Sequence, residues 1–131
     1  MKDNTLLDIA KHHIDLVELI LKYRNDDELS LNQAGYHLQQ ATELGIKYEL
    51  EKNGVEYLKV HNLRSLLNQA KSQDVSLLVP KFINDNKDML SYWEANTRYI
   101  TDFALEYDEV NNALKYIKEY IDNIDYNYSN N

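Results

Sequence analysis

The chain has 131 residues, of which 44% are hydrophobic, and this length and composition predict one soluble globular domain spanning residues 1–131. Its formal net charge of -8 disfavours broad nucleic-acid binding, because an acidic surface repels phosphate backbones. The absence of cysteine excludes disulfides, thiol nucleophiles and cysteine-based zinc sites.

The first helix is predicted over residues 4–24, where apolar residues recur at three- and four-residue steps. After the polar break at residues 24–27, Ser30 is expected to cap a second helix that runs to about Lys52. Asn53-Gly54 predicts the end of that helix, because both residues tolerate the left-handed conformation. Small residues at 41 and 45 predict that a neighbouring helix comes close.

A third, shorter helix is predicted from about Asn62 to Ser72, with His61 or Asn62 as its cap. A fourth begins near Pro80, which fits a first helical turn because its missing N–H costs nothing there. Apolar residues as far as Trp93 mark the buried side of this fourth helix. The third and fourth segments are therefore predicted to be helical, like the first two.

The last part of the chain is expected to hold a polar bend at residues 95–101, a fifth helix over residues 108–124 and a frayed tail from residue 126. No alternating strand pattern bounded by turns is found. The sequence therefore predicts an all-α fold, an antiparallel up-and-down bundle of four to five helices. Charges interrupt the N-terminal segment every few residues, and no stretch approaches the ~20 apolar residues of a membrane span, so we expect a cytoplasmic protein.

Polar side chains in the middle of the second helix are the first candidates for a site. Glutamine amides both donate and accept hydrogen bonds, so Gln39 and Gln40 suit nucleobase edges or ribose hydroxyls, and Lys47 can meet a phosphate. Two other interpretations stay open. The side chains are either a solvated flank or, together with Glu43, they connect the helix to its neighbours through buried hydrogen bonds.

Further along the chain, His61 is a candidate acid/base or ligand contact, or simply a helix cap. Arg98 can bind a phosphate in bidentate fashion or pair with one of the 22 carboxylates. His12 and His13 are adjacent, so a helix points them about 100° apart, and we predict no metal site. Tyrosines near the C-terminus suggest a self-association face, because the ring buries area while the hydroxyl stays wet.

Three segments together suggest a family. They read AGYHLQQATELGIKYELEKNG at residues 34–54, VHNLRSLL at 60–67 and YWEANTRYI at 92–100. In this order they resemble the HEPN family of small helical domains, in which a Tyr/Phe-x-x-Gln-Gln-Ala-x-Glu helix precedes a His-Asp/Asn-Leu at a short helix and an Arg-Tyr before the last helix. One departure is Glu43-Leu44, where the family usually has Glu-Lys.

The resemblance implies a bundle of four or five helices that is usually a homodimer. One branch of the family comprises metal-independent RNases, often toxins, whose motif is an arginine followed after four to six residues by a histidine. The other branch contains nucleotide-binding or substrate-binding partners of minimal nucleotidyltransferases. None of the arginines here, Arg24, Arg64 and Arg98, has a histidine at that distance. A histidine general base is therefore missing from the expected place, and we predict no catalytic residue.

The sequence thus predicts a non-catalytic HEPN-like domain without cofactor. It would bind a nucleotide, or serve as substrate or partner of a separately encoded nucleotidyltransferase in a toxin–antitoxin type of system. The alternatives are an RNase toxin with a degenerate site and a plain protein-interaction module. The predicted ligand-binding residues are Gln39, Gln40, Glu43, Lys47, His61 and Arg98.

Overall fold

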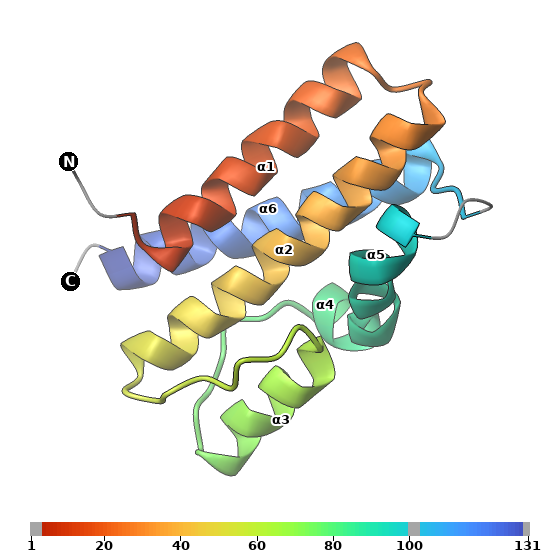
Figure 1. The fold of residues 1–131 in the computed structure, drawn as a ribbon. Helices are drawn as coiled ribbons and strands as arrows, with labels where there is room; N and C mark the ends of the chain where they lie inside the picture. The colour runs from red at the N-terminus through yellow and green to blue at the C-terminus, as the bar shows by residue number, and fades with distance from the viewer. Residues whose placement is uncertain (1–3, 100–102, 130–131) are drawn as a thin grey trace.

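The structure is a computed structural model that describes residues 4–99 and 103–129, with the side chains of residues 98, 99 and 129 left out of the description. Within these two stretches the chain forms six helices and no strand (Figure 1). The predicted all-α bundle is confirmed, with one long predicted helix divided in two.

Two helices begin at the caps that their sequences supply. Helix α1 spans Leu6–Tyr23, and Thr5 and Asp8 each accept a hydrogen bond from the other's backbone N–H at 3.0 Å, which makes a capping box. Helix α3 spans Leu63–Ser72, and the Asn62 side chain accepts from the third N–H of that helix at 3.1 Å. Both predicted helices are confirmed, with Asn62 as the cap of α3.

Helix α2 spans Glu28–Lys52 and starts earlier than predicted. Its cap is Asp27, whose carboxylate accepts from the backbone N–H of Ser30 at 3.1 Å. The prediction that Ser30 is the cap was wrong, because an acidic side chain three residues earlier already satisfies that N–H. At the other end Gly54 takes the left-handed conformation, with a φ of 77°, whereas Asn53 at a φ of -95° does not.

The predicted fourth helix is two helices, α4 over Lys81–Asp85 and α5 over Lys87–Tyr99. Between them the Asn86 side chain donates to the carbonyl oxygen of Phe82 at 2.8 Å. Asparagine competes in this way with the helical backbone pattern, which explains the division. The predicted polar bend at residues 95–101 was wrong as far as Tyr99, because α5 continues to that residue; residues 100 and 101 lie outside the description.

Helix α6 spans Tyr107–Ser129, so residues 126–129 of the tail predicted to fray are helical, and residues 130 and 131 lie outside the description. The reason is a contact with a distant helix, in which the Tyr128 hydroxyl donates to Glu49 at 2.9 Å. This bond holds the last turns of α6 against α2.

Helix α2 is the central element of the bundle and packs against α1, α3, α5 and α6 (Figure 1). Two ion pairs, Lys11–Asp125 at 2.7 Å and Glu18–Lys118 at 2.9 Å, join α1 to an antiparallel α6. Because neighbours surround α2, 15 of its 25 residues are buried, and these include polar and charged ones. The polar side chains of α2 that could form a site are therefore surrounded by neighbouring helices.

Close approach to α6 depends on Gly45. A Cβ atom there would lie 2.9 Å from both Ile121 Cδ1 and Tyr120 Cε2, which confirms the predicted helix contact. Overpacking typically costs about 1–3 kcal/mol and the gain in helix propensity is ~1 kcal/mol, so we expect Gly45→Ala to lower the free energy of unfolding by a net amount of up to about 2 kcal/mol. Urea unfolding measures this change. Asn68→Ala, at an exposed position of α3, should cost nothing, and equal stability of the two variants would contradict the prediction.

Candidate functional site

Three polar side chains lie on successive turns of α2 and are buried together. Gln39, Glu43 and Lys47 are 0%, 2% and 8% exposed. The four-residue spacing places them on one helix face. Lys47 Nζ donates to Glu43 Oε2 at 2.9 Å, and Gln39 Nε2 donates to Glu43 Oε1 at 3.1 Å. The carboxylate is thus the centre of a buried network.

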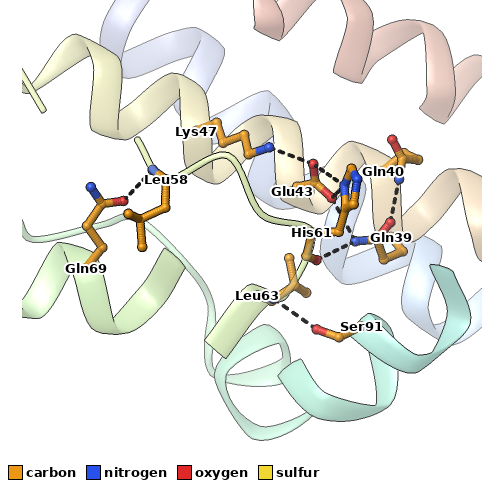
Figure 2. A network of polar contacts seen from close by, with 9 residues as sticks. All are labelled: Gln39, Gln40, Glu43, Lys47, Leu58, His61, Leu63, Gln69 and Ser91. Carbon is orange, nitrogen blue, oxygen red and sulfur yellow. Dashed lines mark hydrogen bonds and ion pairs between the residues drawn. The ribbon is translucent and has the colours of Figure 1, made fainter. Parts of the chain in front are cut away.

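The segment that leads into α3 completes this network (Figure 2). His61 Nδ1 lies 3.1 Å and 3.2 Å from the two Glu43 oxygens, and the His61 carbonyl oxygen accepts from Gln39 Nε2 at 3.1 Å. Helix α5 is attached to the same segment, because the Ser91 hydroxyl accepts from the backbone N–H of Leu63 at 3.0 Å. These contacts join α2, the connecting segment and α5.

The network also indicates which nitrogen of the neutral His61 ring carries its hydrogen. An ionised carboxylate only accepts hydrogen bonds, so Nδ1 of His61 carries a proton beside Glu43. When the ring is neutral, Nε2 is then the acceptor, and the side chain is 67% exposed. The network therefore presents one oriented imidazole at the surface, while the Glu43 oxygens are occupied from within. Gln40, half-buried, donates to Gln39 Oε1 at 2.7 Å.

A shallow depression of about 310 Å³ lies beside this segment, between the start of α3 and α5. Its lining is polar and aromatic and consists of Asn62, Asp88, Ser91, Tyr92, Ala95 and Asn96. The carboxylate in the lining, Asp88, is bound by Arg64 at 2.6 Å and 3.1 Å. The depression thus offers the amides of Asn62 and Asn96 and the ring of Tyr92, whereas the Ser91 hydroxyl already donates to the Lys87 carbonyl oxygen and accepts from the Leu63 N–H.

Five of the six predicted site residues meet in this network, namely Gln39, Gln40, Glu43, Lys47 and His61. Arg98 belongs to α5, and its side chain lies outside the description. Sequence reasoning missed Ser91, because the backbone N–H that its hydroxyl accepts from lies 28 residues earlier in the chain. Ligand binding by these residues stays a prediction.

A second buried carboxylate was also missed. Glu49 Oε2 accepts from the Tyr120 hydroxyl at 2.6 Å, and Glu49 Oε1 accepts from the Tyr128 hydroxyl and from the Leu78 N–H, both at 2.9 Å. Burial raises the pKa of Glu49, and the three hydrogen bonds oppose that rise. Its contacts are internal, so Glu49 connects α2 to α6 and to the loop before α4.

Neither a metal centre nor a membrane span is found in the described part of the chain. There, no three histidine or acidic side chains are grouped in a way that could hold a metal ion. Among the same residues, no helix has both the length and the apolar composition needed to cross a bilayer.

Comparison with known proteins agrees with the motifs and the fold. The family model described as HEPN domain matches residues 5–125. Neither the curated proteins nor the solved structures give a match. The matched region begins just before α1 and ends within α6, so it includes the buried network and the depression beside it. The chain belongs to the HEPN domain family.

Proposed function

We propose that this chain is a non-catalytic HEPN domain that acts, as a homodimer, as the partner and substrate subunit of a separately encoded minimal nucleotidyltransferase. Such a pair would operate in a toxin–antitoxin type of system. Support comes from the family membership and from the lack of any histidine four to six residues after Arg24, Arg64 or Arg98. The general base of the family's RNases is therefore not supplied by this motif.

The observation that carries the proposal is that the site has polar groups for a nucleoside, whereas its cations are already paired with carboxylates. Gln40, His61 Nε2 and the amides of the depression suit a base edge or ribose hydroxyls. The phosphates would be bound less well, because Lys47 is paired with Glu43 and Arg64 with Asp88. A nucleoside triphosphate would thus need the cations of the transferase, which favours a partner role over free nucleotide binding.

A tyrosine at this place can accept the nucleotidyl group. Tyr92 is 65% exposed and lines the depression beside His61. Its phenolic oxygen would attack the α-phosphorus of the nucleotide, form a phosphodiester bond and release pyrophosphate. The phenolic proton would pass to a base of the transferase. The product would carry one nucleoside monophosphate on this chain.

The test is a tagged pull-down from the native host followed by intact-mass measurement. We expect a co-purifying nucleotidyltransferase and a mass increase equal to one nucleotidyl group, lost in Tyr92→Phe. The matched control is Tyr23→Phe, which removes a hydroxyl that is equally exposed, at 68%, but at the end of α1. An unmodified homodimer without a transferase would contradict the proposal. RNA cleavage that is lost on Arg98→Ala would instead support the ribonuclease alternative.

A further inference from the structure

Three of the four histidines gather on the side of the bundle where α1 packs against α2. The Nδ1 atoms of His13 and His37 lie 2.9 Å apart, and their ring centroids are 5.1 Å apart. The His12 ring centroid lies 6.4 Å from that of His13. His13 and His37 are half-buried, whereas His12 is exposed. The pair joins two helices whose contact forms a large part of the bundle.

At this separation there is room for only one hydrogen between the Nδ1 atoms of the two imidazoles. One Nδ1 must donate and the other must accept, so the hydrogen bond exists when at least one ring is neutral. If both rings are protonated, two N–H donors and two positive charges face each other. The contact between His13 and His37 then changes from attraction to repulsion.

The surroundings of the pair oppose protonation. Burial is the main reason why the pKa of His13 falls to about 4, and the charges of His37 and His12 lower it further. Burial and then His12 lower the pKa of His37. Glu43, from α2, acts in the opposite direction on His13. Burial and mutual repulsion therefore both favour the neutral form of the two rings.

The other contacts around this part of α1 and α2 are one aromatic contact and two ion pairs. On the α2 side, the ring of Tyr36 meets His37 edge-on with centroids 5.4 Å apart. On the α6 side of α1, Lys11 pairs with Asp125 at 2.7 Å, and Glu18 pairs with Lys118 at 2.9 Å. Those ion pairs join α1 to a different helix from the one that carries His37.

We propose that the His13–His37 hydrogen bond is a proton-operated latch that holds α1 to α2 at neutral pH and releases when both rings are protonated. The direction follows from linkage. Because the folded pKa values lie below that of a free histidine, the opened state binds protons more tightly than the closed state. The stabilisation is complete above pH ~6.5 and is lost as pH falls towards ~4.

Hydrogen–deuterium exchange at pH 7 and pH 4.5, in buffer containing EDTA, tests the latch. After correction for the intrinsic exchange rate, we expect the α1 amides to lose at least about tenfold in protection at pH 4.5, the effect of a one-unit pKa difference. The amides of α3 are the internal reference, since α3 does not contact α1. Equal losses in both helices would overturn the proposal.

A double variant separates this pair from other acid-sensitive groups. In His13→Gln/His37→Gln the two amides can keep a neutral hydrogen bond, so the loss of α1 protection at pH 4.5 should shrink to the loss seen in α3. His12→Gln is the matched control at the exposed neighbour. In this variant the protection of α1 should depend on pH as it does in the wild type. Where the double variant does not fold, NMR titration of the wild type decides. His13 must then titrate well below the value of 6.5 for a free histidine, and titration of His13 at that value would overturn the latch.

Discussion

Glu49→Ala is expected to lower the free energy of unfolding by about 3 kcal/mol or more. The change leaves the hydroxyl of Tyr120, a residue 1% exposed, and the backbone N–H of Leu78 without their acceptor. A buried group without its partner, such as the Tyr120 hydroxyl, costs about 1–3 kcal/mol. The half-buried Leu78 N–H and the cavity left by the Glu49 side chain add to this loss. Urea unfolding should show a lower midpoint with an unchanged slope.

The matched control for this prediction lies two residues further along the same helix. Glu51 is exposed, so Glu51→Ala should change stability by no more than about 0.5 kcal/mol. Similar losses in the two variants would mean that water replaces the Glu49 carboxylate, which would contradict its role as a buried connection. A pH series adds a second check. Because burial raises the folded pKa of Glu49, wild-type stability relative to Glu49→Gln should fall as pH rises above 4.5.

Glu43→Ala is expected to lower the free energy of unfolding by a similar amount, for an electrostatic reason. Lys47 is 8% exposed, and without Glu43 its ammonium is a buried charge that has lost its carboxylate. Removal of one partner of a buried pair typically costs about 3–5 kcal/mol. The cation–π contact with Tyr57, at 5.2 Å, replaces only part of this stabilisation. Thermal or urea unfolding measures the loss.

The double variant Glu43→Ala/Lys47→Met is the decisive comparison, because it removes the orphaned charge along with its partner. It should be more stable than Glu43→Ala alone. Asp88→Ala breaks the solvent-exposed pair with Arg64 and should change stability little. If Glu43→Ala were as mild as Asp88→Ala, the network would not be a structural element. A ligand role would then be the better account of its residues.

Local pattern was enough to predict some elements. The helices α1 and α3 each bury a single apolar stripe, which gives the three- and four-residue repeat that periodicity detects. Their caps lie next to them in the chain. The division at Asn86 was not visible in the same way, because apolar residues continue on both sides of it and the competing hydrogen bond comes from one amide side chain.

Contacts between distant segments explain the remaining differences. The amides of α2 indicated a polar feature correctly, but their partners include a carbonyl oxygen that lies 22 residues further on. Tyr128 was assigned to a frayed tail, since its bond to Glu49 spans 79 residues. His13 and its partner His37 lie on successive helices, and their contact spans 24 residues. Spacing within one helix carries no information on such pairs.

The central position of α2 also has a consequence for biosynthesis. Its buried carboxylate Glu49 depends on Tyr120 and Tyr128, which are 71 and 79 residues away in the chain. At the usual rate of translation, the partners follow on the order of 10 s after Glu49 has been made. During that interval a helix that ends up enclosed on most sides is still open to water and to other chains. We therefore expect ribosome-bound fragments that end before α6 to be protease-sensitive and to recruit chaperones.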